Sequence, residues 1–142
     1  MLARVNWLAV VAVVVLNMVA GAAWYGALGD PWMSAIGKGM ADFDGIPPTI
    51  YLLPVLSSIL NALILATVMQ LADEVTPAGG VKWGLLLWVG LVFPYALIHN
   101  AFGAFPFALT LIDTGLALVT MVGDGLVLGL LRPRAVAASA SA

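Results

Sequence analysis

The stretch VNWLAVVAVVVLNMVAGAAWYGAL, residues 5–28, contains no Asp, Glu, Lys or Arg. As an α-helix it would be about 36 Å long, enough to cross a hydrocarbon core about 30 Å thick. A spanning strand would need only about ten residues of alternating character, whereas this stretch is continuously apolar. In lipid a helix satisfies all its backbone groups internally, so the stretch predicts a transmembrane helix.

Three further apolar runs follow, and each is long enough to span. The four runs cover residues 5–28, 49–71, 83–102 and 107–131. The chain has five Lys and Arg and seven Asp and Glu residues, and only Asp113 and Asp124 fall within a run. The sequence therefore predicts an all-α membrane protein with four transmembrane helices in an antiparallel bundle, as a single domain over residues 1–134.

The composition supports this fold class and excludes several functions. Hydrophobic residues make up 63% of the chain and charged residues 8%, where a soluble domain carries about 25% charged residues. The net charge of -2, without a basic cluster beyond Arg132 and Arg134, argues against a nucleic-acid partner. The absence of cysteine excludes disulfides and thiolate metal sites, and a single histidine argues against a metal or haem centre, so we expect no cofactor.

The distribution of Lys and Arg predicts the orientation. With a cytoplasmic N-terminus, Arg4, Lys82, Arg132 and Arg134 lie inside and only Lys38 lies outside, which is the bias that cytoplasmic loops show. The abundance of Ala, Val, Leu and Gly is typical of bacterial proteins. We therefore expect a multi-pass protein of the bacterial inner (cytoplasmic) membrane, in contact with membrane lipids and with both termini in the cytoplasm.

The segments between the runs are short apart from residues 30–48. Asp30 and Pro31 form a suitable helix start, and Trp32, Met33 and Ile36 then recur on one face, which suggests a short interfacial helix between the first and second spans. A glycine-rich loop that dips toward lipid is the alternative. The Ala and Ser tail, residues 135–142, is expected to be disordered.

Several segments resemble an uncharacterised bacterial membrane family, domain of unknown function 1761. The resemblance rests on VNWLAV at residues 5–10, GAAWYG at 21–26, Trp32-Met33, the Gly-rich start of the third span at 81–90 and Gly129-Leu130-Leu131. It implies four spanning helices and no particular activity. The chain departs from the family at Asp113-Thr114-Gly115, where the fourth helix often carries a histidine.

Asp113 is the strongest candidate for a functional residue, because an ionised side chain within a span costs up to about 3 kcal/mol unless it has partners. His99 and Asn100 end the third span at a similar depth, and Tyr25 ends the first span on the same side. With Thr110 they predict an outer-half site for a proton, an ion or another small ligand. The alternative is that Asp113 only bonds a neighbouring helix while His99 lies at headgroup level.

Other polar and small residues predict helix contacts. A polar bundle interior, or dry interhelical hydrogen bonds, is expected from Asn17, Ser57, Asn61 and Thr120. Near the inner boundary Asp124 is expected to form an interfacial ion pair with Arg4, Lys82 or Arg132. Close helix packing, within one chain or between protomers, is expected at Gly21, Gly125 and Gly129.

Three functions remain open on this basis. The first is a small transport or solute-binding protein, expected to be a homo-oligomer; because four helices enclose little space, a pathway would need either several protomers or a very small substrate. The second is an accessory or assembly subunit of a larger membrane complex. The third and weakest is a membrane-embedded enzyme that uses His99 and Asp113 as acid and base, for which no nucleophile or cofactor motif is present.

Overall fold

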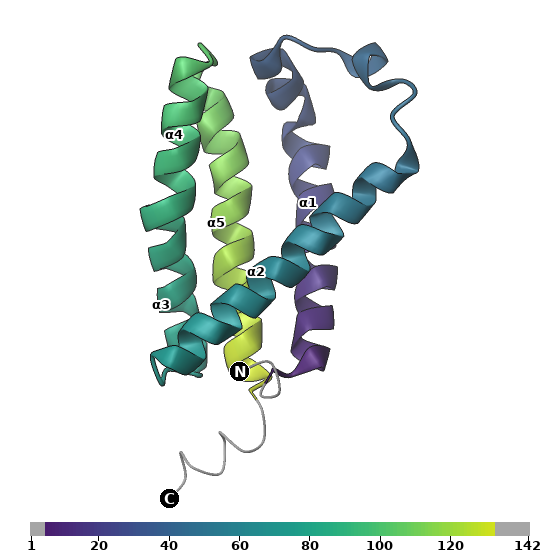
Figure 1. The fold of residues 1–142 in the computed structure, drawn as a ribbon. Coiled ribbons are helices and arrows are strands. Elements are labelled where there is room, and N and C mark those ends of the chain that lie inside the picture. The colour runs from purple at the N-terminus through teal and green to yellow at the C-terminus, as the bar shows by residue number, and fades with distance from the viewer. Residues whose placement is uncertain (1–4, 133–142) are drawn as a thin grey trace, which may run out of the picture.

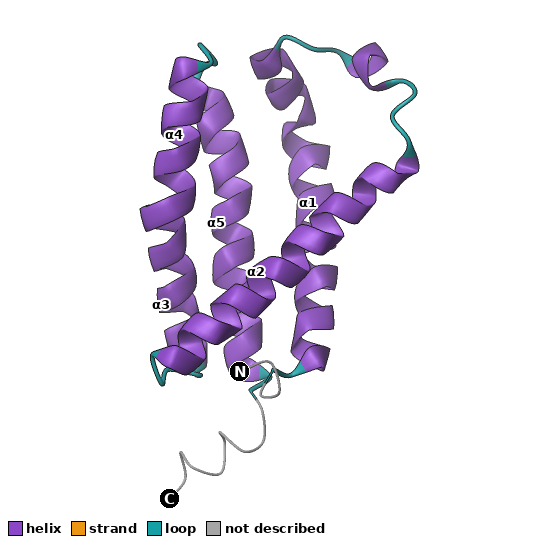
Figure 2. Ribbon diagram, in the orientation of Figure 1, coloured by secondary structure: helices purple, strands orange, loops and turns teal. Residues whose placement is uncertain are grey.

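The computed structural model describes residues 5–132 and confirms the four predicted spans. Four helical segments are long and apolar enough to cross a membrane: Trp7–Ile36, Pro48–Leu71, Pro77–Phe102 and Phe107–Leu130. Within the described residues all regular structure is helical (Figure 2). Large apolar side chains on every span face outward, as expected of a surface that contacts lipid.

The third and fourth spans lie side by side, and the first and second spans lie next to this pair (Figure 1). The third span is one continuous rod made of α3 (Pro77–Leu87), a π-helical turn η4 (Trp88–Val92) and α4 (Phe93–Phe102), and it lies along α5 (Phe107–Leu130). On the other side of α5 lies α1 (Trp7–Ile36), while α2 (Leu52–Leu71) crosses the bundle obliquely. We call the end where α1 begins and α5 ends the terminal end, and the opposite end the loop end.

The first helix is longer than predicted. It continues through Asp30 and Pro31 to Ile36 and ends at Gly37, whose φ of 68° is the left-handed conformation that glycine adopts without strain. Proline removes a backbone donor and displaces the carbonyl four residues before it, but membrane helices tolerate this because neighbouring groups satisfy the freed backbone. A short helix does lie between the first and second spans, but it is the 3-10 turn η2 (Met40–Phe43) and does not begin at Asp30.

The third span also begins earlier than predicted. Thr76 caps α3 by accepting a hydrogen bond from the Gly79 backbone N–H at 3.0 Å, and Pro77 takes the first helical position. Gly79 and Gly80, which precede the predicted start of this span at residue 83, are therefore helical and buried.

Glycines on α3 and α5 bring these two backbones into direct contact. A Cβ atom built at Gly80 would overlap the carbonyl of Gly125, one at Gly84 would overlap that of Met121, and one at Gly129 would overlap that of Thr76. We call Gly80, Gly84, Gly125 and Gly129 the glycine seam. Of the three glycines predicted to pack helices, Gly125 and Gly129 lie in this seam within one chain, whereas a Cβ at Gly21 would meet nothing within 4 Å.

The apolar core lies toward the terminal end. It joins Val10 and Val13 of α1, Leu65 and Met69 of α2 and Leu128 of α5. The earlier half of α2 adds only the partly buried Ile59 to this core, and its leucines are exposed. The oblique path of α2 in Figure 1 follows from this one-sided packing.

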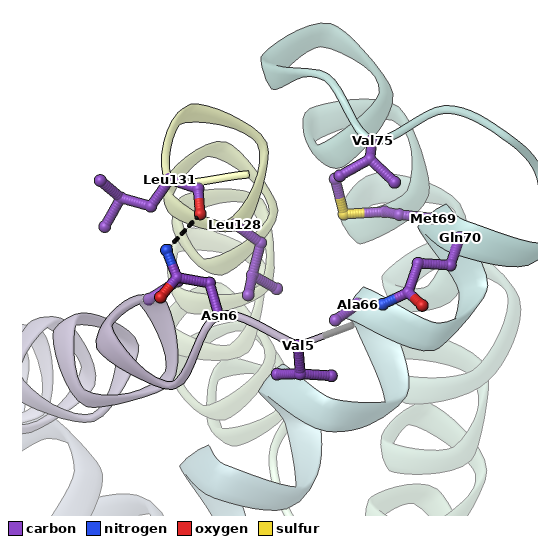
Figure 3. A pocket seen from close by; sticks show the side chains of 9 residues that line it. Val5, Asn6, Ala66, Met69, Gln70, Val75, Leu128 and Leu131 are labelled. Carbon is purple, nitrogen blue, oxygen red and sulfur yellow. Dashed lines mark hydrogen bonds between the residues drawn. The ribbon is translucent and has the colours of Figure 1, made fainter. Parts of the chain in front are cut away.

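At the terminal end the start of α1 is tied to the end of α5. The Asn6 side chain donates a hydrogen bond to the Leu131 carbonyl oxygen at 2.7 Å, and it also caps α1 by accepting from the Leu8 N–H at 3.1 Å (Figure 3). Figure 3 shows the small cavity beside this contact, lined mainly by apolar side chains such as Val5 and Met69. At about 20 Å³ it has room for about one water molecule, so it is a packing gap.

Candidate functional site in the membrane

The most buried carboxyl group of the described residues is Asp124, whose exposure is 0%. It lies on α5, where that helix meets α1 and α2. The Asn17 side-chain amide of α1 donates to Asp124 Oδ2 and to Ser58 Oγ of α2, both at 3.2 Å. Ser58 in turn donates to the Pro54 carbonyl at 2.7 Å. Asn17, Ser58 and Asp124 form the group that we call the buried triad.

Two oxygen atoms of the buried triad have no hydrogen-bond partner within residues 5–132. They are Asn17 Oδ1 and Asp124 Oδ1. The amide oxygen is an acceptor only, and so is each carboxylate oxygen while Asp124 is ionised. Leaving a buried acceptor unsatisfied costs about 1–3 kcal/mol, and more for a charged group. A proton on the carboxyl group or a bound cation would remove this cost.

The expected ion pair of Asp124 is not formed with Lys82 or Arg132. Over the part of the chain that the structure describes, the single ion pair joins Lys82 to Glu74 at 2.7 Å, and Arg4 lies outside the described residues. The reason is depth: Asp124 lies seven residues before Leu131, or about 10 Å from the terminal end of α5. At that depth the carboxyl group is surrounded by helices and not by headgroups.

A cavity of about 140 Å³ borders Asp124. It lies between α2, the π-helical turn and α5, and its lining includes Asn61, Leu91, Val92 and Met121 as well as Asp124. This volume has room for several water molecules. Single π-helical turns within α-helices are frequent at functional sites, and here such a turn supplies part of the cavity wall.

The second carboxyl group within a span, Asp113, lies farther along α5 toward the loop end and is half-buried. Its Oδ1 atom accepts hydrogen bonds from the Tyr25 hydroxyl at 3.3 Å and from the Trp32 indole N–H at 3.0 Å. The sequence predicted the contact with Tyr25 but not the one with Trp32. The indole N–H of Trp24 bonds the Ile112 carbonyl at 3.0 Å and so fixes α1 against α5 at the same level.

His99 and Asn100 do not join Asp113. The His99 side chain is exposed and stacks on Tyr95 of its own helix, with ring centroids 5.8 Å apart. Asn100 is buried and donates to Thr110 Oγ1 at 3.0 Å, so these two form a separate α4–α5 contact. The predicted outer-half cluster is therefore divided, with Tyr25 and Asp113 in one place and Asn100 and Thr110 in another.

The four residues predicted to form a polar bundle interior lie in different surroundings. Ser57 is exposed and its neighbour Ser58 takes the buried position, while Asn61 is exposed and lines the cavity beside Asp124. Thr120 bonds carbonyl oxygens of its own helix. Asn17 alone of these four reaches another helix through a hydrogen bond.

No three His, Cys, Asp or Glu side chains come together in residues 5–132. A cation at the buried triad would therefore be held by one carboxyl group, one amide oxygen and one hydroxyl oxygen. Oxygen ligands of this kind suit hard cations, and a single carboxylate balances one positive charge.

Four apolar helices that are long enough to span make this chain a multi-pass integral membrane protein. Its last span contains two carboxyl groups, Asp113 and Asp124. The sequence model of the family described as "Protein of unknown function (DUF1761)" matches residues 8–129. The chain belongs to this family, which confirms the resemblance seen in the first, third and fourth spans. Comparisons with curated proteins and with solved structures gave no match.

Proposed function

We propose that this protein binds a proton or a small monovalent cation at Asp124 inside the membrane, and that this binding serves transport. The observation that carries the proposal is the complete burial of Asp124, whose own Oδ1 and the Oδ1 of its partner Asn17 have no hydrogen-bond partner within residues 5–132. Carboxyl groups within spans are rare and mark ion or proton pathways.

The buried triad supplies the chemistry for reversible binding. With Asp124 protonated, the carboxyl group is neutral and the cost of a buried charge disappears. With Asp124 ionised, a cation bound by Asp124, Asn17 and Ser58 would balance the charge in the same place. Release in either case leaves an unbalanced carboxylate, so loading and unloading favour different arrangements of the helices around the triad.

The cavity that borders Asp124 has room for water next to the proposed binding site. It extends from Asp124 to Asn61, whose amide is exposed on α2 at a level where only lipid or another protein would surround it. We propose that a second copy of the chain covers this side, since four helices alone enclose little space and a polar amide in hydrocarbon needs a partner. The proposed setting is the bacterial inner membrane with cytoplasmic termini. In support, Lys38 is the one Lys or Arg in the sequence that lies toward the loop end, and cytoplasmic segments are the ones rich in Lys and Arg.

Carbodiimide labelling tests the buried site directly. Dicyclohexylcarbodiimide is apolar and adds to protonated carboxyl groups, and the adduct is counted from the intact mass of the purified protein. We expect labelling in the wild type, loss of labelling in Asp124→Asn and retention in Asp113→Asn. Slower labelling in sodium chloride than in choline chloride would identify a cation as the ligand, and equal rates would identify a proton.

Transport is tested in liposomes with an entrapped pH indicator, and with radioactive sodium when the labelling shows protection by sodium. Asp124→Asn should abolish the flux that the wild type supports, while Asp113→Asn should not. Equal flux in the wild type and Asp124→Asn would refute the transport role. A stoichiometric foreign protein in gently extracted samples would favour an accessory subunit of a larger complex instead of a homo-oligomer.

A further inference from the structure

Asp113 lies at the level where lipid headgroups begin. The terminal ends of α1 and α5 coincide, because Asn6 bonds the Leu131 carbonyl. Asp113 lies 18 residues before Leu131, or about 27 Å along α5, and the hydrocarbon core is about 30 Å thick. The group around Asp113 is therefore at the boundary of the leaflet on the loop side, and not at the depth of Asp124.

The Asp113 carboxylate is only partly engaged. Both of its hydrogen bonds, from Tyr25 and from Trp32, go to Oδ1, and within residues 5–132 no donor bonds Oδ2. The side chain is half-buried, so this second oxygen remains accessible from the surface. A negatively charged group at a membrane boundary with one free oxygen is suited to a cationic partner.

Aromatic rings surround this carboxylate. Tyr25 and Trp32 meet edge to face with centroids 5.5 Å apart, and Phe43 of η2 lies 5.9 Å from Trp32. Aromatic faces attract ammonium groups, and a combination of rings with a carboxylate is how proteins recognise quaternary and primary ammonium ligands. The loop that contains η2 thus completes a cluster begun by α1 and α5.

A fixed positive charge lies at the edge of the same cluster. The Lys38 Nζ atom is 5.9 Å from the centre of the Phe43 ring and forms no ion pair with Asp113. Asp113 and Lys38 thus bring a negative and a positive group to one cluster, and these charges are complementary to those of a headgroup that carries an ammonium and a phosphate. We call Tyr25, Trp32, Lys38, Phe43 and Asp113 the headgroup cluster.

We propose that the headgroup cluster binds a zwitterionic phospholipid of the loop-side leaflet. The Asp113 carboxylate pairs with the lipid ammonium, Tyr25 and Trp32 flank that ammonium, and Lys38 contacts the phosphate. A soluble amine carries the same ammonium chemistry, but a lipid is favoured because the site lies at the membrane boundary. This site is independent of Asp124, so either proposal can fail alone.

The test is lipid retention by the purified, delipidated protein, measured by native mass spectrometry. The probes are phosphatidylethanolamine and phosphatidylglycerol with identical acyl chains, because both carry a phosphate but only the first carries an ammonium. We expect the wild type to retain phosphatidylethanolamine preferentially. Asp113→Asn should lose that preference by about ten-fold, the factor that corresponds to a charge-assisted hydrogen bond of about 1.4 kcal/mol.

Matched variants separate the roles of the cluster. Asp30→Asn removes an exposed carboxylate near the same end of α1 and should leave the preference unchanged. Lys38→Gln should weaken retention of both lipids alike, because both have a phosphate. The amide oxygen of Asp113→Asn can still accept from Tyr25 and Trp32, so this variant should fold, and circular dichroism would verify it.

Three results would overturn the proposal. They are equal retention of the two lipids by the wild type, an unchanged preference in Asp113→Asn, and an equal loss in Asp30→Asn. Soluble ethanolamine that displaces the lipid at comparable concentration would overturn the assignment to a lipid and identify a free amine as the ligand.

Discussion

Adding one methyl group at Gly80 should separate α3 from α5. A Cβ atom there would lie 2.9 Å from the Gly125 Cα atom and nearer still to its carbonyl, whereas ordinary contact begins at 3.4 Å. Because the carbonyl atoms are nearer than the Cα atom, the backbones must move apart by about 1 Å or more, and a gap of that size forfeits about half of the dispersion energy of each atom pair across it. The seam involves backbone atoms, which cannot rotate away as a side chain can.

The magnitude follows from two opposing terms. Overpacking a tight contact costs about 1–3 kcal/mol, and the upper end applies because α3 and α5 make the most extensive helix contact in the structure. Replacing glycine by alanine within a helix returns about 0.5–1 kcal/mol. We expect Gly80→Ala to lower the free energy of unfolding by about 2 kcal/mol.

The control is Gly21→Ala, where a Cβ would meet nothing within 4 Å. This variant should raise the free energy of unfolding by up to about 1 kcal/mol, since only the helix-propensity term applies. The assay is unfolding in mixed micelles with increasing dodecyl sulfate, followed by circular dichroism. If Gly80→Ala unfolds at the same detergent fraction as Gly21→Ala, the seam between α3 and α5 is not as described.

Two further predictions concern the terminal end. The hydrogen bond from Lys82, aided by one from Trp83, lowers the pKa of the Glu74 carboxyl, so Glu74 contributes stability above its ordinary pKa of about 4.3 and loses it as the pH falls. Glu74→Gln should therefore flatten the fall in melting temperature between neutral and strongly acidic pH, and a curve identical to the wild type would contradict this. Asn6→Ala should cost about 1 kcal/mol as a lost helix cap and should also free the Leu131 carbonyl, which faster amide exchange in the first turn of α1 would reveal.

The spans could be predicted because hydropathy depends on sequence alone. Charged residues flank the runs except at the short turn of residues 103–106, and the structure differs from the prediction chiefly at the ends. The first span was expected to stop before Asp30 and Pro31, but α1 continues to Ile36 because membrane helices tolerate a proline.

The rotation of each helix could not be predicted, because packing against neighbours determines it. Consecutive residues on a helix differ by about 100° in direction, and a shift of one position therefore changes the buried residue. Ser58 faces the bundle in place of Ser57, and Asn100 faces α5 while His99 faces away. A single sequence contains no signal that distinguishes these neighbours.

The sequence predicted that Tyr25 lies near Asp113, but it did not predict the hydrogen bond from Trp32. Trp32 was assigned to a separate interfacial helix, so its reach to Asp113 required the continuous α1. For Asp124 the sequence indicated a carboxyl group within a span, but it could not show that the Asn17 amide, which also bonds Ser58, would be its partner in place of a Lys or Arg side chain.

The backbone contact along the glycine seam has a mechanical consequence. Two helices joined without intervening side chains move as one stiff plate, because no rotamer change can absorb their relative displacement. The joints of α1 and α2 with that plate consist of side chains, which can reorganise, and Asn17, Ser58 and Asp124 lie at such a joint. Binding or release of a proton or cation at Asp124 would therefore change the angle between this stiff pair and the two remaining helices, α1 and α2.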